Sequence, residues 1–121
     1  MLHVENLTRN TVLVEQGRVA DNFWTKFRGL MGVRQLLPGG GLLITHCDNV
    51  HTHFMRMPID VLYVNHHNCI VSIDPAMKTW RIGRKRADSA YVIELPSGTA
   101  MHTQSAIGDQ LKISNGHSDP K

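Results

Sequence analysis

The sequence contains no apolar run that approaches the roughly 18 residues needed to cross a membrane. Its first residues, Met1 to Asn6, carry neither the basic start nor the apolar stretch of a secretory signal. The chain also has only two cysteines. We therefore expect no membrane partner, a cytoplasmic location, and free thiols at Cys47 and Cys69 rather than a disulfide.

The signatures of the common catalysts are missing as well. The chain has no Gly-x-Ser-x-Gly segment, no phosphate-binding loop and no nucleotide-binding glycine fingerprint. The run Pro38-Gly39-Gly40-Gly41 is rich in glycine, but it lacks the lysine and the hydroxyl residue that a phosphate loop requires. These absences favour a protein that is not an enzyme.

The composition is that of a folded protein, with 41% hydrophobic and 19% charged residues in a chain of 121. Because there are no repeats and no linker, we expect a single compact β-rich domain over residues 1–114 and a frayed tail over 115–121. The net charge of +3 has a local origin. Five of the 13 basic residues lie between positions 78 and 86, and the remaining eight face ten acidic residues.

Alternation of apolar and polar residues is the main structural signal. Leu2–Asn6 and Thr11–Glu15 alternate with the period of a half-buried strand, and Gln16-Gly17 reads as a turn after the second. Asn65–Asn68 is a predicted hairpin loop in which Asn68 takes the left-handed conformation. Further strands are predicted at Leu42–Thr45, His51–Met55, Ile59–Val64, Cys69–Ile73, Tyr91–Leu95 and Leu111–Ser114, with a turn at Ile107–Asp109.

One segment has helical spacing instead. Asp21 is a suitable N-cap, and Phe23, Trp24 and Phe27 follow on one face, which predicts a short helix near residues 21–29 at one end of a sheet. The expected fold is therefore mainly β, with α+β at the margin, and is a compact antiparallel barrel or sandwich of short strands with one short helix. The predicted core contains Phe23, Trp24, Phe27, Leu42, Ile44, Phe54, Met55, Leu62, Tyr91, Ile93 and Leu95.

Several fragments occur together in an order and spacing that resemble a known family, the domain-of-unknown-function family numbered 192. The fragments are Phe23-Trp24-Thr25-Lys26-Phe27-Arg28-Gly29-Leu30-Met31-Gly32, Gly41-Leu42-Leu43-Ile44, His51-Thr52-His53-Phe54-Met55-Arg56-Met57-Pro58-Ile59-Asp60-Val61-Leu62, Tyr91-Val92-Ile93-Glu94-Leu95-Pro96-Ser97-Gly98 and Ile107-Gly108-Asp109. The resemblance covers about residues 2–114. It implies a single compact, mostly β domain from a group of small uncharacterised prokaryotic proteins, and it implies no known activity, substrate or cofactor.

Three charged residues, Arg28, Asp60 and Glu94, are embedded in apolar sequence. Buried charges need partners, and the arginine fork suits a carboxylate, so we predict that the three converge in space. The cluster is either an ion pair that stabilises the fold or part of a pocket. In the second case, the candidate ligand-binding residues are Arg28, His51, His53, Arg56, Asp60 and Glu94. The preferred function is then a non-catalytic binding module for a small anionic molecule or a peptide segment.

The histidines leave a second interpretation open. Two histidines at alternate positions of a strand point to the same face, about 7 Å apart. We expect no cofactor, but zinc is the alternative, with His46, Cys47, His51 and His53 as candidate ligands. A hydrolase-type enzyme that uses His51, His53 and Asp60, with or without a metal, is the corresponding alternative function.

The basic loop offers a third interpretation. One tryptophan among five cations is the combination used to bind anions or single-stranded nucleic acid, although a solvated loop has the same composition. The candidate residues are Lys78, Trp80, Arg81, Arg84, Lys85 and Arg86. A nucleic-acid accessory protein is therefore a further alternative. We expect a monomer or a weak homodimer formed through an open sheet edge.

Overall fold

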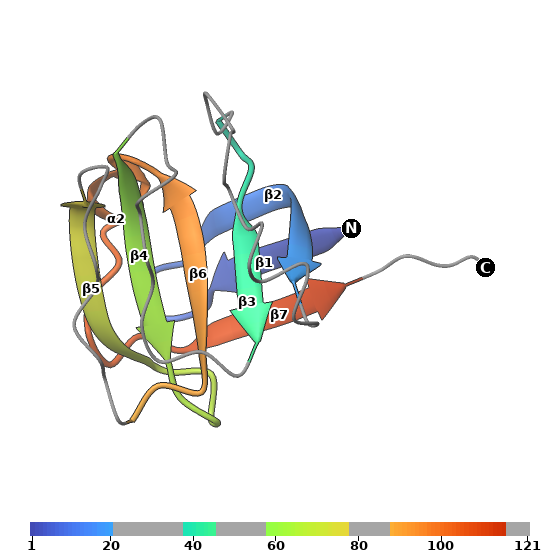
Figure 1. Ribbon diagram of the computed structural model, residues 1–121. Coiled ribbons are helices and arrows are strands. Elements are labelled where there is room, and N and C mark those ends of the chain that lie inside the picture. Colours follow the sequence, from blue (N-terminus) through green and yellow to red (C-terminus); the bar gives the residue numbers. More distant parts are fainter. Residues whose placement is uncertain (21–37, 46–57, 78–87, 116–121) are drawn as a thin grey trace.

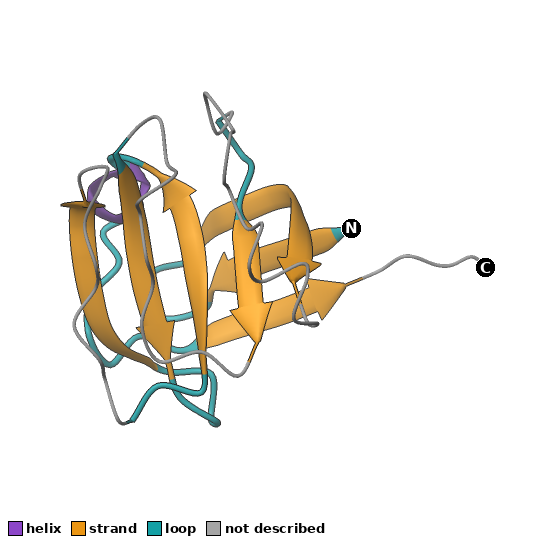
Figure 2. Ribbon diagram, viewed as in Figure 1, coloured by secondary structure: helices purple, strands orange, loops and turns teal. Residues whose placement is uncertain are grey.

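The computed structural model describes residues 1–20, 38–45, 58–77 and 88–115. Within these residues, seven strands form one sheet in the order β5-β4-β6-β3-β2-β1-β7 (Figure 1). The elements are β1 (Leu2–Asn6), β2 (Thr11–Ala20), β3 (Leu42–Thr45), β4 (Ile59–Val64), β5 (Ile70–Met77), β6 (Tyr91–Pro96), α2 (Thr99–His102) and β7 (Leu111–Asn115). In the described residues, the mainly β fold with one short helix is confirmed (Figure 2).

The sheet is curled into a half-barrel. Strands β5 and β7 stand at the two ends of the strand order, yet the residues just before them, Cys69 and Gln110, form an isolated antiparallel bridge. Backbone hydrogen bonds fasten this junction, from the Ile70 N–H to the Asp109 carbonyl at 3.0 Å and from the Leu111 N–H to the Asn68 carbonyl at 2.8 Å. The result is the barrel-like alternative rather than two stacked sheets.

Strand β2 joins the two halves of the sheet. Its first part pairs antiparallel with β1, and its last part pairs parallel with β3, with Arg18 opposite Leu42. A Cβ atom at Gly17 would lie 2.6 Å from the Gly41 carbonyl oxygen, so this crossing requires glycine. The turn predicted at Gln16-Gly17 is therefore wrong, because glycine here permits a close approach of two strands instead of a change of direction.

The interior of the half-barrel holds one apolar cluster. It consists of Leu2, Val4, Leu13, Val14, Leu43, Leu62, Val64, Ile70, Ile93, Leu95, Ala100 and Leu111. Of the predicted core, Leu62, Ile93 and Leu95 belong to this cluster, and Tyr91 packs against it. Leu42 and Ile44 are also buried but lie on the other side of the sheet. The remaining predicted core residues, Phe23, Trp24, Phe27, Phe54 and Met55, lie outside the described residues.

The turns predicted at Asn65–Asn68 and Ile107–Asp109 are confirmed. Asn68 has φ 62° in the hairpin after β4, and Gly108 has φ 96° in the turn before β7. Strand β7 extends to Asn115, which pairs with Leu2, so the strand takes in the first residue of the predicted tail. Cys69 is a free thiol, as expected.

Helix α2 was not predicted. It has four residues after a left-handed Gly98, which is too short to produce a helical period in the sequence. The predicted helix near 21–29, the predicted strand at 51–55, Cys47 and the residues 116–121 fall outside the described residues. In the part of the chain that the structure describes, no helix is long and apolar enough to cross a membrane.

Candidate functional site

The sheet register separates the two described carboxylates of the predicted cluster. Asp60 lies opposite Leu95 in the β4–β6 ladder, whereas Glu94 lies opposite Val61. Successive side chains of a strand point to opposite faces, so Asp60 faces the interior with Leu95 and Glu94 faces away from it. The two carboxylates do not converge, which corrects that part of the prediction. The other predicted members, Arg28, His51, His53 and Arg56, lie outside the described residues.

Asp60 has a structural position. Its side chain is 1% exposed, and its Oδ2 accepts hydrogen bonds from the backbone N–H groups of Gly98, at 3.1 Å, and Ala100, at 2.8 Å. These groups open α2, where N–H groups lack partners within the helix. Asp60 therefore attaches the start of α2 to the sheet.

Glu94 is different. Its side chain is 4% exposed, and its Oε1 is buried without a hydrogen bond from any described residue. Burial raises the pKa of the Glu94 carboxyl to about 7. Transfer of a carboxylate away from water without a partner is costly, so the group keeps its proton up to neutral pH.

The surroundings of Glu94 are apolar. We call the side of β3, β6 and β4 that faces away from the core cluster the outer face. Besides Glu94, it carries Leu42, Ile44, Ile59, Val61, Tyr63 and Val92, all at most 7% exposed. Both sides of these three strands are thus covered, and Glu94 is an acidic group inside an otherwise apolar layer.

Leu42, Glu94 and Val61 lie opposite one another and form a cross-strand row, which continues onto the neighbouring strands β2 and β5. Val61 lies opposite Asp74 of β5, and Leu42 lies opposite Arg18 of β2. Arg18 and Asp74 are therefore each two strands from Glu94, or about 10 Å between Cα atoms. The Tyr63 hydroxyl donates to Asp74 Oδ2 at 2.9 Å.

Sequence reasoning did not include Arg18, Tyr63 or Asp74 among the candidates. The alternation of Arg18 with the inward Val19 was the available signal for the first of them. It was hidden because β2 was expected to end before Gln16. Tyr63 on β4 is hydrogen-bonded to Asp74 on the adjacent strand β5, and this pairing follows only from the register of the two strands.

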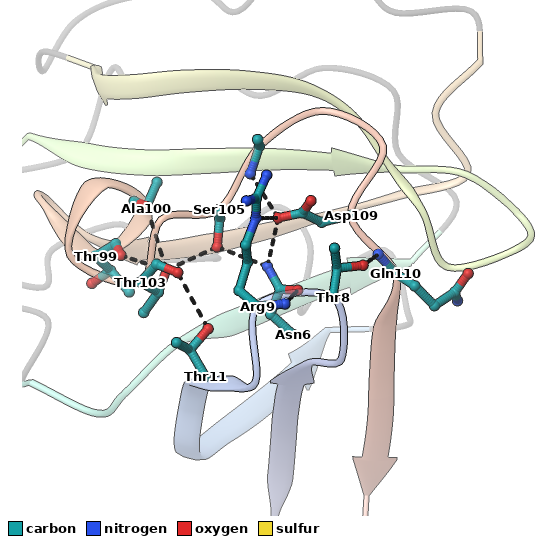
Figure 3. A network of polar contacts seen from close by, with 11 residues as sticks. Asn6, Thr8, Arg9, Thr11, Thr99, Ala100, Thr103, Ser105, Asp109 and Gln110 are labelled. Atoms are coloured by element: carbon teal, nitrogen blue, oxygen red, sulfur yellow. Dashed lines mark hydrogen bonds and ion pairs between the residues drawn. The ribbon is translucent and has the colours of Figure 1, made fainter.

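A second polar network lies between the β1–β2 turn and the segment that follows α2 (Figure 3). Asp109 Oδ2 accepts from Asn6 Nδ2 at 2.9 Å, from Arg9 Nε at 3.0 Å and from the Ala106 N–H at 2.9 Å. Burial alone would raise the pKa of Asp109, but these hydrogen bonds and the Arg9 charge outweigh it and lower the pKa. Asp109 is a partnered carboxylate that connects distant parts of the chain.

The described residues contain no group of three or more histidine, cysteine, aspartate or glutamate side chains suited to a metal ion. The predicted zinc ligands His46, Cys47, His51 and His53 lie outside those residues. So do the basic-loop candidates Lys78, Trp80, Arg81, Arg84, Lys85 and Arg86. The zinc and nucleic-acid interpretations stay predictions.

Comparison with known proteins identifies relatives over nearly the whole chain. The profile of the family DUF192, described as "Uncharacterized ACR, COG1430", matches residues 5–113. A UPF0127 protein of Pyrococcus furiosus is 32% identical over 110 residues, which cover 88% of this chain and 94% of the relative. A UPF0127 protein of Thermococcus sibiricus is 28% identical over 113 residues, which cover 88% of this chain and 71% of the relative.

Two crystal structures share the fold. A Sinorhizobium meliloti 1021 protein, described provisionally as a transcription regulator, has a TM-score of 0.80 at 22% identity over 93% of this chain and 91% of its own. A Novosphingobium aromaticivorans protein of unknown function has a TM-score of 0.78 at 16% identity over 92% of this chain and 82% of its own. At these identities the likeness establishes the fold alone.

Proposed function

This chain belongs to the uncharacterised DUF192 family, and on that premise we propose that it is a non-catalytic binding module whose ligand site is the outer face around Glu94. The observation that supports the proposal is the Glu94 Oε1 atom, buried and without a described hydrogen-bond donor. A buried acceptor without a partner costs about 1–3 kcal/mol of stability. Such costs concentrate at functional sites, where a ligand supplies the missing partner.

The described residues favour a peptide segment over a small anionic molecule as the ligand. An anion placed beside the Glu94 carboxyl is repelled whenever that group is ionised. A peptide carries N–H donors for Oε1 and carbonyl oxygens that the Arg18 guanidinium, in the same row, can bind. One extended peptide can therefore offer a carbonyl oxygen to Arg18 and an N–H donor to Glu94.

Amide NMR spectra of the ¹⁵N-labelled protein test this proposal. Pools of five-residue peptides, sorted by the central residue, are added one at a time. At least one pool is expected to shift the amide signals of β6, β4 and β3 while those of the Asp109 network stay in place. Glu94→Gln is expected to reduce the shifts, and Glu5→Gln on β1, half-buried and outside this row, is expected to keep them. The proposal fails if every pool leaves the outer-face signals unchanged.

One observation favours a catalytic alternative in a modified form. Asp60, predicted as part of a hydrolase site, is occupied by two backbone N–H groups. Glu94, with a pKa of about 7, is the described carboxyl suited to proton transfer at neutral pH. A hydrolase would need Glu94 next to a reacting bond. A screen with ester and amide substrates in which Glu94→Gln abolishes turnover would identify it.

A further inference from the structure

The ligand group that reaches Glu94 has to be a hydrogen-bond donor. A carboxylate has no proton to donate, and a protonated carboxyl still has one oxygen that only accepts. In the described part of the chain, Oε1 is the one buried side-chain polar atom without a partner. Asp60 and Asp109, the other buried carboxylates, each accept at least two hydrogen bonds. The deficiency at Glu94 is therefore local and specific to an acceptor.

The side chains around Glu94 are apolar, so the part of the ligand next to its donor group should be apolar as well. Leu42 and Val61 flank Glu94 in the same row, and Val92 lies two residues away on the same strand and face. All three are at most 1% exposed. Because these three side chains are already buried, a group that contacts Glu94 has to displace what covers them, and the atoms that precede the donor should be hydrocarbon.

The charges near the site favour a cationic donor. The residues opposite Glu94 on the adjacent described strands are apolar, Leu42 on β3 and Val61 on β4. Tyr63, two residues along β4 on the same face, donates its hydroxyl to Asp74. The next strands contribute Arg18 and Asp74, which have opposite signs and are equally far from Glu94 in strand number. When Glu94 ionises, the row therefore has one uncompensated negative charge in a poorly solvated place, where a cation interacts most strongly.

We infer that the outer face recognises a primary amine on an alkyl stem, such as the lysine side chain of a peptide segment. This inference rests on the proposed binding function and names its ligand class. An ammonium group is compact and has three donors, whereas a guanidinium has five that would need additional buried acceptors. The lysine stem packs against Leu42, Val61 and Val92, while the ammonium donates to Glu94 Oε1.

Binding of the ammonium competes with the Glu94 proton. The lysine amine stays charged below about pH 10, so Glu94 is the described group of this face that changes state near neutrality. Because its pKa is about 7, the ionised fraction of Glu94 falls about tenfold between pH 8 and pH 6. The dissociation constant of a lysine peptide should rise about tenfold over the same interval.

The test uses three acetylated, amidated five-residue peptides that differ only at the central position, which is lysine, norleucine or glutamate. Norleucine keeps the stem and lacks the amine. Calorimetric titration of the whole chain at pH 8 is expected to give a lysine peptide that binds at least tenfold more tightly than the norleucine peptide. At pH 6 the lysine advantage should shrink about tenfold. Glu94→Gln should remove the advantage at both pH values, and Glu5→Gln should preserve it.

The outcomes are distinguishable. If the norleucine or glutamate peptide binds as tightly as the lysine peptide and shifts the outer-face amides, the amine inference is wrong and the binding function stands. If the lysine preference survives in Glu94→Gln or is unchanged at pH 6, the amine does not contact Glu94. If none of the three peptides binds, the amine inference is wrong, and the peptide pools decide whether the binding function stands.

Discussion

Three carboxylates are buried in the described residues, and their hydrogen bonds divide them into two kinds. Asp60 and Asp109 are each held by backbone N–H groups, and Asp109 also by the side chains of Asn6 and Arg9. Glu94 has a buried oxygen that no described residue satisfies. Hydrogen bonds within the fold account for the first two, and for the third we propose a ligand.

The pH dependence of stability distinguishes Glu94 from an ordinary glutamate. Its pKa rises from 4.5 to about 7 on folding, so the folded state holds the proton more tightly than the unfolded state. The stability that this group contributes is fully present below pH 4.5 and is lost as the pH rises through 7. The loss amounts to about 3 kcal/mol at alkaline pH.

Glu94→Gln should remove that loss. We predict that the variant and the parent have similar unfolding free energies at pH 4, and that the variant is more stable at pH 8, by up to about 3 kcal/mol. Urea unfolding across this range measures it, with Glu5→Gln as the control. Parallel pH profiles for Glu94→Gln and the parent would show that Glu94 is not a buried, unpartnered acid.

The contribution of Asp109 to stability changes with pH in the opposite direction. Its pKa is lowered, so its contribution to stability is present above its ordinary value of 3.8 and is lost as the pH falls through the folded value. Asp109→Asn should destabilise the protein at pH 7 by about 1–3 kcal/mol, because Arg9 loses its charged partner. The same urea measurement at pH 2–3 should show a smaller difference. A difference that does not shrink in acid would contradict this assignment.

Among the elements, β2 decides how the two halves of the sheet meet. A Cβ at Gly17 would also lie 2.8 Å from Val14 Cγ1, and one at Gly41 would lie 2.6 Å from Val14 Cγ2. We predict that Gly17→Ala and Gly41→Ala each cost about 1–3 kcal/mol through overpacking. The exposed neighbour Gln16→Ala is the matched control and should change stability little. Equal unfolding midpoints for Gly17→Ala and Gln16→Ala would mean that the crossing is not tightly packed.

Helix α2 depends on Asp60. Asp60→Ala leaves the N–H groups of Gly98 and Ala100 without their acceptor, which should cost about 1–3 kcal/mol and speed hydrogen exchange at the buried Ala100 amide. Peptide binding at pH 8 should be retained, because Asp60 and Glu94 lie on opposite faces. Loss of binding in a folded Asp60→Ala protein would show that Asp60 contributes to the binding site.

Much of the element list could be predicted from two patterns. The half-buried strand Leu2–Asn6 alternates apolar and polar residues, whereas Leu42–Thr45 and Ile59–Val64, which are buried on both faces, are short and mainly apolar. Leu2–Asn6, Leu42–Thr45 and Ile59–Val64 have the predicted bounds. The site could be predicted only in part. Glu94 was recognisable as a charge in apolar sequence, but the face that it occupies depends on the register with β3 and β4. Arg18 was hidden because Gly17 suggests a turn to local reasoning and a strand crossing only in three dimensions.

At the scale of the whole molecule, the curled sheet explains why one side chain is isolated. The interior cluster takes up one side of β3, β6 and β4, and the outer face of the same strands is also buried. A polar atom between two covered layers, such as Glu94 Oε1, cannot form a hydrogen bond with solvent. Glu94 therefore has its unusual environment because of its position in the middle of the sheet order.

That residues 1–114 form one domain stays a prediction. We propose that the chain unfolds in a single transition, with β7 lost together with β5 because they are joined at the Cys69–Gln110 bridge. Far-ultraviolet circular dichroism and hydrogen exchange at β1, β5 and β7 should give one coincident midpoint. Separate midpoints for β4–β5 and β1–β7 would indicate two independently stable halves. Cytoplasmic location and a monomer or weak homodimer remain predictions from the sequence.

The most direct test of the central claim is a ¹³C NMR titration of the Glu94 side-chain carboxyl, alone and with the lysine peptide. The account predicts a midpoint near pH 7 for the free protein. It also predicts a lower midpoint with the lysine peptide bound, since the ammonium stabilises the ionised carboxylate. A midpoint near 4.5 in the free protein would contradict it, because Glu94 would then be solvated or already paired.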